Sequence, residues 1–332
     1  MTADDRTSAE DRLIARYFKP LATAPGALAL TDDAAIIAPP PGCDLVVTTD
    51  GVIAGVHFFP HDPPALIAAK VLRMNLSDLA AKGAKPVGFL LSIALPERIE
   101  EEWIANFAKG LGSDAAYYGC PLLGGDTDHT PGPLAVTVAA FGAVPHGKMV
   151  RRTTAQVGDV VVVTGTIGDA ALGVLKRKDS ILEKRWALTD EQNNDLKNRY
   201  LLPQPRTALA EAVLHNASAA MDVSDGLVGD LAKMCRGSGV AADIDVARVP
   251  VSEAAQVALT ADATLLETIL TGGDDYEILL TLPPPRLDAF RAAALAADVA
   301  ISEIGRIVAG EGAHFIHDGK TLNFARPSYS HF

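Results

Sequence analysis

Short runs of valine, leucine and isoleucine alternate with longer segments of helical periodicity over the whole chain. This alternation predicts an α/β or α+β fold. Strands are expected at Leu45–Thr49, Val87–Leu95, Leu134–Val144, Val160–Thr164, Ala219–Val223, Tyr276–Leu282 and Ile301–Val308. Helices are expected at Pro64–Lys82, Glu100–Tyr118, Asp169–Lys178, Arg206–His215, Asp225–Arg236 and Pro285–Ala297.

The length of the chain, 332 residues, favours two domains, because a typical domain has ~150 residues. The best candidate for the junction is Gly147–Gly158, where the composition turns polar and basic between two expected strands. We therefore expect one domain at residues 1–147 and a second at residues 148–332. The charged segment Lys176–Asn198 has few apolar residues and is expected to be a surface excursion.

The chain is acidic, with 29 Lys and Arg against 41 Asp and Glu and a net charge of −12. Nucleic acid and anionic membranes are not expected partners, because both are negatively charged. The longest charge-free apolar runs are shorter than the ~18 residues of a membrane span. Cys43, Cys120 and Cys235 form no C-x-x-C pair, which suits a reducing cytosol. We expect a cytoplasmic protein that binds any anionic ligand through cations.

Aspartates recur beside Gly, Ser or Thr, mostly at the ends of expected strands. They are Asp33, Asp50 after Leu45–Thr49, Asp126 after Gly124-Gly125, Asp222 and Asp225 around Ser224, and Asp274 with Asp275 after Gly272-Gly273. Open α/β sheets place ligands at such strand ends, and glycines let the backbone approach a phosphate closely. Each segment alone also fits an ordinary turn, an exposed loop charge, or a helix cap at Ser224 or Asp225.

Asp78 differs from these because it lies in an expected helix that is otherwise apolar. Asn75 and Asp78 are three residues apart and share one helix face. If the carboxylates converge, each pair of charges ~4 Å apart costs about 4 kcal/mol at an effective dielectric of ~20, so cations are needed. Oxygen ligands of this kind, with the hydroxyls of Thr48 and Thr49 nearby, suit Mg²⁺ or Ca²⁺, and Mg²⁺ commonly bridges carboxylates to phosphates.

Another candidate for anion binding is the segment Gly165–Gly168, between the strand Val160–Thr164 and the helix Asp169–Lys178. The N-terminus of a helix can hold an anion. An ordinary turn between a strand and a helix explains the two glycines equally well.

Together these segments resemble the thiamine-monophosphate kinase family, whose members use ATP to convert thiamine monophosphate into thiamine diphosphate. The similarity runs from Leu13 to Phe332 and is weakest around Lys176–Tyr200. The segments that carry it are Asp32–Ala35, Thr48–Asp50, Gly55–Phe58, Asn75–Ala81, Gly124–Thr127, Asp222–Leu227 and Gly272–Glu277. Each segment is weakly specific alone, whereas the full set in this order is highly specific.

The resemblance implies a two-domain aminoimidazole ribonucleotide synthetase-like fold. In that fold an N-terminal α/β domain forms a homodimer through its sheet, and a C-terminal α/β domain follows. ATP is implied as co-substrate together with several Mg²⁺ ions. The residues implied for magnesium are Asp33, Thr48, Thr49, Asp50, Asp78, Asp126, Asp222 and Asp225. Those implied for ATP are Gly125, Asp126, Arg152 and Ser224, and those on the substrate side are His57, Asp274 and Arg326.

Some residues depart from the family pattern. Thr31 stands where members commonly carry glycine, Asp274 where they carry glutamate, and Arg326 where a tryptophan would stack on the thiamine rings. The substrate-side departures leave open a second hypothesis, an ATP-dependent enzyme of the same fold with a different small-molecule acceptor. A third hypothesis is a nucleotide-binding regulator without turnover, which the nearly complete acidic set disfavours.

The expected chemistry is direct in-line phosphoryl transfer without a side-chain general base. A phosphomonoester has a second pKa of ~6, so such an acceptor is mostly a dianion at pH 7 and has no proton to lose before attack. Phosphoryl transfer depends on positioning and on charge stabilisation more than on covalent participation by the protein.

Overall fold

The computed structural model describes residues 8–179 and 181–328. The chain divides into two compact units, which are described one at a time. Unit 1 comprises the residues up to Leu79 together with Lys85–Gly147, and unit 2 comprises Ala80–Ala84 with the residues from Lys148 onward. No helix in the described part of the chain combines the length and the apolar character needed to cross a lipid bilayer.

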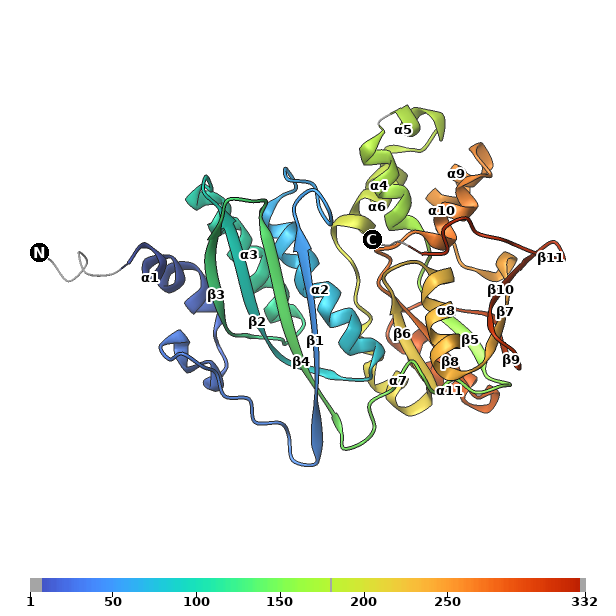
Figure 1. Cartoon of the computed structure of the whole chain (residues 1–332), viewed down its shortest axis with the longest axis horizontal. Coiled ribbons are helices and arrows are strands. Elements are labelled where there is room, and N and C mark those ends of the chain that lie inside the picture. Colours follow the sequence, from blue (N-terminus) through green and yellow to red (C-terminus); the bar gives the residue numbers. More distant parts are fainter. Residues whose placement is uncertain (1–7, 180, 329–332) are drawn as a thin grey trace, which may run out of the picture. The chain divides into compact units, whose positions relative to one another are not determined.

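The α-helices and strands alternate along much of the chain (Figure 1). The α-helices are α1 (Ala9–Leu13), α2 (Pro64–Ala81), α3 (Glu101–Tyr117), α4 (Asp169–Lys178), α5 (Ile181–Arg185), α6 (Asp190–Leu201), α7 (Ala210–Asn216), α8 (Leu227–Ser238), α9 (Glu253–Ala261), α10 (Leu265–Thr271) and α11 (Leu287–Ala296). The strands are β1 (Cys43–Ile53), β2 (Lys85–Pro96), β3 (Leu122–Thr130), β4 (Ala135–Pro145), β5 (Val160–Thr164), β6 (Ala219–Val223), β7 (Ala241–Asp245), β8 (Glu277–Leu282), β9 (Ile301–Val308), β10 (Gly312–His317) and β11 (Lys320–Thr321).

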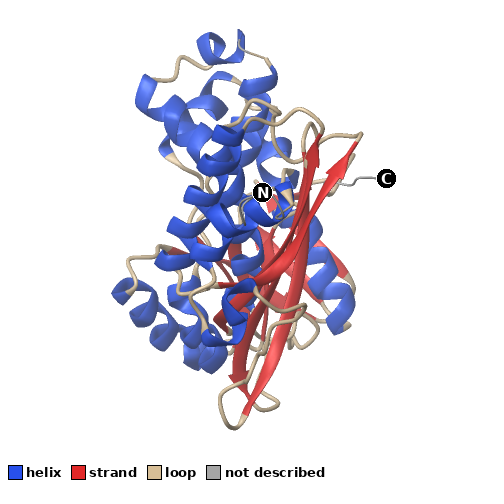
Figure 2. Cartoon of the chain, turned by 90° about the vertical axis from the view of Figure 1, so that its left-hand side faces the viewer, coloured by secondary structure: helices blue, strands red, loops and turns tan. Residues whose placement is uncertain are grey.

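Unit 1 is built on a 4-stranded sheet with the order β1-β4-β2-β3. Strand β4 pairs antiparallel with both β1 and β2, whereas β2 and β3 run parallel. Helices α2 and α3 cover one face of this sheet (Figures 1 and 2). The residues of β4 alternate accordingly: Val136 and Val138 are buried, and Thr137 between them is exposed. This is the period-two pattern of a sheet covered on one face.

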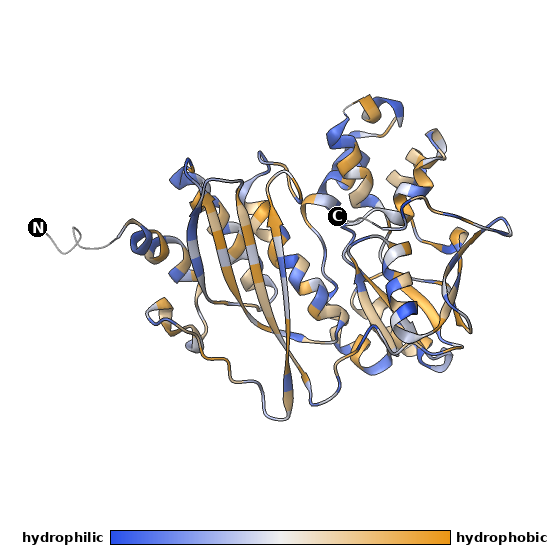
Figure 3. Ribbon diagram, in the orientation of Figure 1, coloured by the Kyte–Doolittle hydropathy of each residue, from blue (hydrophilic) through white to orange (hydrophobic). Residues whose placement is uncertain are grey.

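The other face of the unit 1 sheet carries exposed apolar side chains. Val47 of β1 is 60 % exposed and Ile53 is 39 % exposed. Val47 lies opposite the half-buried Phe141 of β4. In Figure 3 apolar residues colour much of β1, β2 and β4, whereas β3 is largely hydrophilic. Exposed apolar surface of this kind is typical of an interface with another molecule.

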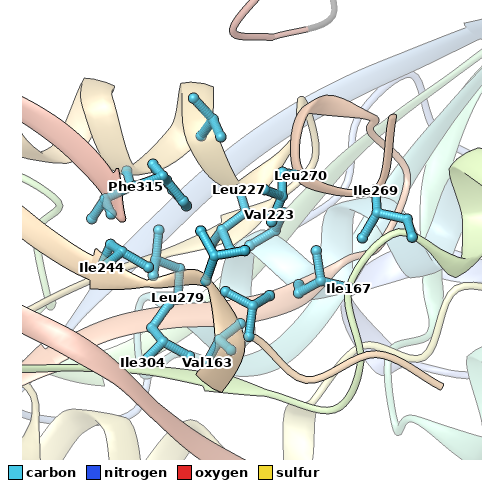
Figure 4. Close-up of a cluster of buried hydrophobic side chains, with 14 of the residues drawn as sticks. Val163, Ile167, Val223, Leu227, Ile244, Ile269, Leu270, Leu279, Ile304 and Phe315 are labelled. Atoms are coloured by element: carbon cyan, nitrogen blue, oxygen red, sulfur yellow. The ribbon is translucent and has the colours of Figure 1, made fainter. Parts of the chain in front are cut away.

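Unit 2 contains a 7-stranded sheet with the order β11-β10-β7-β9-β5-β8-β6. Strand β5 lies inside this sheet and is buried along its whole length. Its valines alternate between two hydrophobic clusters, one of which contains Val161 and Val163 and the other Val160 and Val162. Figure 4 shows the first cluster around Val163 and Leu279. An unbroken valine run is what a strand buried on both faces requires.

Each expected strand and helix overlaps one in the structure, but some boundaries and segments were wrong. Strand β1 continues past Thr49 to Ile53, so Asp50 lies inside the strand, opposite Val138. The Asp50-Gly51 pair is typical of a turn, yet pairing with β4 outweighs that local preference. Strands β3, β7, β10 and β11 were not predicted, and in β3 the residues after Gly124 are polar.

The segment Lys176–Asn198 is also more than a surface excursion. Helix α6 within it packs against α4, and Leu196 is fully buried. The buried Lys176 ammonium donates hydrogen bonds to the backbone and side-chain oxygens of Asn193, at 3.0 and 2.6 Å. Because these buried residues are polar or widely spaced, hydrophobic periodicity does not reveal the packing.

Candidate active site

In unit 1, α2 lies against β1 through polar side chains. The Thr48 hydroxyl donates to Asp78 Oδ2 at 2.5 Å, and the Asp50 backbone N–H donates to Asn75 Oδ1 at 3.0 Å. Asn75 is fully buried and also donates its amide to the Val71 carbonyl at 2.9 Å. The expectation that Asn75 and Asp78 share a face is therefore confirmed. This face brings together Thr48, Asp50 and Asp78 from the predicted metal set.

Thr49 does not join that group. Successive side chains of a strand point to opposite faces, so Thr49 points away from Thr48. Its hydroxyl donates to the Val138 carbonyl at 3.0 Å, and the residue is exposed.

Strand β3 carries Gly125 and Asp126, both exposed. They lie in the parallel ladder opposite Leu91 and Ser92 of β2, so the interpretation of this segment as an ordinary turn was wrong. A Cβ at Gly125 would lie 1.8 Å from the Leu91 carbonyl oxygen, a distance that excludes any side chain. Glycine is therefore required by the close approach of β2.

Asp33 and His57 lie outside the strands of unit 1. Asp33 is exposed in a loop. The half-buried His57 accepts the Ile53 backbone N–H at Nδ1, at 3.0 Å, which leaves Nε2 as the protonated nitrogen in the neutral ring.

In unit 2, β6 ends in the turn that carries the predicted Asp222, Ser224 and Asp225. Asp222 is inside β6, opposite Ile278, and is 6 % exposed. The backbone N–H groups of Ser224 and Asp225 both donate to Asp230 Oδ2, at 3.0 and 2.9 Å. Neither Ser224 nor Asp225 makes a side-chain cap at the start of α8.

Lys233 of α8 completes this turn. Its ammonium contacts Asp225 Oδ2 at 2.5 Å and Asp230 Oδ1 at 2.9 Å. The Asp230 side chain is fully buried, and burial raises its pKa although the Lys233 charge opposes the shift. Both Asp230 oxygens are thus occupied by protein donors, which makes Asp230 a support of the turn.

The loop Gly272–Tyr276 lies directly against the same turn. The backbone N–H of Asp274 donates to the Ser224 carbonyl at 2.9 Å, and that of Tyr276 donates to the Val223 carbonyl at 2.8 Å. A Cβ at Gly273 would lie 2.3 Å from the Ser224 oxygen. The structure therefore brings Ser224, predicted on the ATP side, next to Asp274, predicted on the substrate side.

The Gly165–Gly168 segment does not offer a free anion site. Both carboxylate oxygens of Asp275 accept the Gly168 backbone N–H, at 3.0 and 2.8 Å. Asp275 is 1 % exposed, and this burial raises its pKa well above the ordinary value. The N-terminus of α4 is occupied by the protein's own carboxyl group.

The remaining predicted residues, Arg152 and Arg326, are exposed and belong to unit 2. No ion pair among the described residues involves either guanidinium. Within the same residues, no three His, Cys, Asp or Glu side chains gather closely enough to hold a metal ion. The predicted magnesium residues divide between the two units, with Asp222 and Asp225 in unit 2 and the others in unit 1.

Sequence reasoning missed several polar residues at the site. These are Asp230, Lys233, Arg199 and Glu277, together with the role of Asp275. The available signal was chemical: Asp230 and Lys233 interrupt an apolar helix three residues apart, and Glu277 begins an apolar strand. Buried charges at such places are expected to be paired.

Comparison with known proteins identifies the family. Residues 31–144 match the model of the AIR synthase related protein, N-terminal domain, and residues 156–318 match that of its C-terminal domain. The thiamine-monophosphate kinase of Caulobacter vibrioides is 40 % identical over 322 residues, which cover 96 % of this chain and 89 % of the relative. The chain belongs to the thiamine-monophosphate kinase family.

Solved structures of this family agree with the fold. The crystal structure of thiamine-monophosphate kinase from Stenotrophomonas maltophilia K279a matches with a TM-score of 0.82 and 37 % identity, over 94 % of this chain and 96 % of the other. A structure of AaThiL complexed with AMPPCP and TMP matches with a TM-score of 0.77 and 30 % identity, over 91 % of each chain. The expected two-domain aminoimidazole ribonucleotide synthetase-like fold is confirmed.

Proposed function

We propose that this protein transfers the terminal phosphoryl group of ATP to thiamine monophosphate and forms thiamine diphosphate and ADP. The observation that carries the proposal is the match, over 91 % of each chain, to a family member that holds AMPPCP, an analogue of ATP, together with TMP. The family's relatives match nearly the full chain, so the activity is assigned to the whole molecule.

Magnesium is proposed as the cation that brings the two anions together. The proposed ligands are oxygens of carboxylates and hydroxyls, which Mg²⁺ prefers. Those in unit 1 are Asp33, Thr48, Thr49, Asp50, Asp78 and Asp126, and those in unit 2 are Asp222 and Asp225. In the described residues no Lys or Arg pairs with Asp33, Asp78 or Asp126, which supports this choice. When bound, Mg²⁺ would neutralise charge on the phosphate oxygens.

Asp225 is the weakest member of the proposed metal set. Its Oδ2 is already held by Lys233 at 2.5 Å. A metal ion would therefore have to use the other oxygen of Asp225 or compete with the Lys233 ammonium. Thr49 is exposed and points to the other face of β1, so its part in metal binding is also expected to be minor.

We assign ATP binding to Gly125, Asp126, Arg152 and Ser224. The exposed Gly125 presents bare backbone, which can approach a phosphate closely. The Arg152 guanidinium is exposed and can form two parallel hydrogen bonds with phosphate oxygens. His57, Asp274 and Arg326 are assigned to the acceptor. We propose that residues 1–147 form the dimer interface and most of the ATP and metal contacts. Residues 148–332 would provide the remaining contacts.

Transfer is proposed to be direct and in line, with no side-chain base. The acceptor phosphate has a second pKa of ~6 and is mostly a dianion at pH 7. The residues of the chain therefore act by binding and orienting the two substrates and by compensating charge. His57 uses Nδ1 to accept a backbone N–H, so this nitrogen is engaged in holding the ring.

A homodimer formed through the unit 1 sheet is part of the proposal. The exposed Val47 and Ile53 on the uncovered face support it, because burying apolar surface stabilises an interface. The cytoplasm is the proposed location, since ATP is available there.

The direct test is an assay of purified protein with Mg²⁺, ATP and thiamine monophosphate, in which ADP and the phosphorylated product are both followed. The proposal expects stoichiometric ADP and thiamine diphosphate, with free thiamine a poor acceptor. ATP turnover with another acceptor but not with thiamine monophosphate would support the second hypothesis. Nucleotide binding without turnover on any acceptor would support a regulator.

A further inference from the structure

The loop that carries Asp274 is held in an unfavourable backbone conformation. Asp274 has φ of +72° and Tyr276 has φ of +52°. Non-glycine residues rarely adopt this left-handed region, and they persist there only where surrounding contacts fix them. The Asp274 backbone N–H bonded to Ser224 holds one side of the loop.

Arg199 of α6 holds the other side. Its Nη2 donates to the Asp275 backbone carbonyl at 3.3 Å and to Glu277 Oε1 at 2.8 Å. These two acceptors lie immediately before and after Tyr276, one of the two strained residues. The Arg199 side chain is only 14 % exposed, so its contacts face little competition from water.

Both carboxylate oxygens of Glu277 are bound by side chains of the protein. Its side chain is fully buried, and its oxygens also accept from Arg206 Nε and from the Thr164 hydroxyl, both at 2.7 Å. With two guanidinium groups and a hydroxyl as donors, the carboxylate has no capacity left for a substrate. Glu277 therefore serves as the fixed point on which Arg199 rests.

Asp274 makes this support important. The aspartate side chain is short, with only one methylene between its Cα and its carboxylate. Such a short side chain has few rotamers with which to compensate for a displaced backbone, so the position of its carboxylate follows the loop closely. The Tyr276 hydroxyl, which donates to Asp274 Oδ1 at 3.2 Å, moves with the same loop.

We propose that Arg199 is a positioning residue for the phosphoryl acceptor, which acts by holding the Gly272–Tyr276 loop so that Asp274 faces the acceptor. Arg199 itself does not touch the substrate. This inference rests on the proposed function, and specifically on the assignment of Asp274 to the acceptor side. It gives α6 and the charged segment around it a part in acceptor binding.

The test compares Arg199→Met and Arg199→Lys with the wild-type protein by steady-state kinetics. For Arg199→Met we expect the KM for thiamine monophosphate to rise about tenfold and the KM for ATP to stay within about twofold. Arg199→Lys keeps the charge but loses the forked donor. Its KM for thiamine monophosphate should therefore lie between the values of the wild-type protein and Arg199→Met. Arg185→Met is the control, because Arg185 pairs with Asp262 at 2.9 Å in the same unit, and among the described residues no hydrogen bond or ion pair joins it to the loop.

A double variant separates positioning from general destabilisation. If Arg199 acts through Asp274, then Asp274→Ala with Arg199→Met should have the acceptor KM of Asp274→Ala alone. Calorimetric binding of thiamine monophosphate in the presence of AMPPCP should give the same order of affinities without turnover. If Arg199→Met does not fold, the kinetic and calorimetric measurements are made on Arg199→Lys.

Several results would overturn the inference. They are an unchanged acceptor KM in the Arg199 variants, a parallel rise of both KM values, and an effect that simply adds to that of Asp274→Ala. In each case active wild-type protein would leave the proposed function standing. Wild-type protein that does not phosphorylate thiamine monophosphate would overturn the proposed function and this inference together.

Discussion

The carboxylates of unit 1 and unit 2 differ in their burial and in the groups that bind them. In unit 1, Asp78 accepts a hydrogen bond from a threonine hydroxyl, and Asp126 is exposed on β3. In unit 2, Asp230 and Glu277 are fully buried and are bound by lysine or arginine. Unit 1 can also form such pairs, since Arg73 binds Asp114 at 2.5 Å.

This difference separates two uses of acidic residues in one chain. A buried carboxylate that is saturated by cationic side chains and backbone N–H groups has its charge compensated inside the protein. A carboxylate that is half-buried or exposed and has no such cation keeps the capacity to bind a metal ion. The acidic net charge alone does not distinguish the two, and their partners do.

The largest expected effect concerns the paired carboxylates. Arg206→Met removes one of the two guanidinium groups on the fully buried Glu277 and leaves its charge undercompensated. We expect the free energy of unfolding to fall by about 3 kcal/mol, measured by urea denaturation. Arg291→Met is the control, because Arg291 pairs with an exposed Asp288, and its loss should cost less than about 1 kcal/mol. An equal loss of unfolding free energy in the two variants would contradict this difference between buried and exposed ion pairs.

The next effect concerns the unpaired carboxylates. Asp78→Asn keeps the size of the side chain and removes a proposed metal ligand, so kcat should fall about 100-fold, roughly 2.7 kcal/mol in the barrier. The free energy of unfolding should stay unchanged, because no ion pair is broken. Asp128→Asn changes an exposed acid in the same unit and should leave kcat unaltered. Full activity of Asp78→Asn at low magnesium would return Asp78 to a structural role.

A pH dependence is expected from Asp275 in unit 2. Burial raises its pKa in the folded protein, so the native state holds the proton more tightly than the unfolded chain does. Its contribution to stability is therefore complete below the unfolded pKa of ~3.9 and is lost as pH rises through the folded value. Asp275→Asn should flatten this part of the stability curve measured by urea denaturation. An unchanged slope would contradict the prediction, because it would mean that the pKa of Asp275 is the same in the folded and unfolded protein.

The smallest effect tests whether the two units are equally well packed. Cys120 in unit 1 and Cys235 in unit 2 are fully buried, and burial raises their pKa values to about 12 and about 11. Both thiols should resist a maleimide at pH 8, whereas the half-buried Cys43 should react. Fast labelling of Cys120 alone would mean that unit 1 opens readily, and its unpaired carboxylates would then reflect loose packing.

The sequence was sufficient for the fold class, for most helices and strands, and for the shared face of Asn75 and Asp78. Its motifs were also specific enough to identify the family. It failed where pairing between distant segments overrides local preference, as when β4 extends β1 through Asp50 and when β2 draws the polar β3 into the sheet.

The sequence also did not predict the residues that support the site. Arg199 and Glu277 meet across 78 positions of sequence, and no local period marks such a contact. Lys233 lay only three residues from Asp230, but a helical charge pair of that spacing is most often a surface feature. Folding, and not the motif pattern, decides which acidic residues receive a cation.

The contrast between the two sets of carboxylates is tested most directly by calorimetric titration of Mg²⁺ into the full-length protein in the presence of AMPPCP. The comparison uses wild-type protein, Asp78→Asn and Asp169→Asn. Asp169 belongs to the paired set in unit 2: its Oδ2 lies 3.9 Å from Arg199 Nε, and its oxygens also accept the hydroxyls of Thr166 and Ser252, both at 2.5 Å. We predict at least about tenfold weaker Mg²⁺ binding for Asp78→Asn and wild-type binding for folded Asp169→Asn. Unchanged binding in Asp78→Asn, or an equal loss in both variants, would contradict the account.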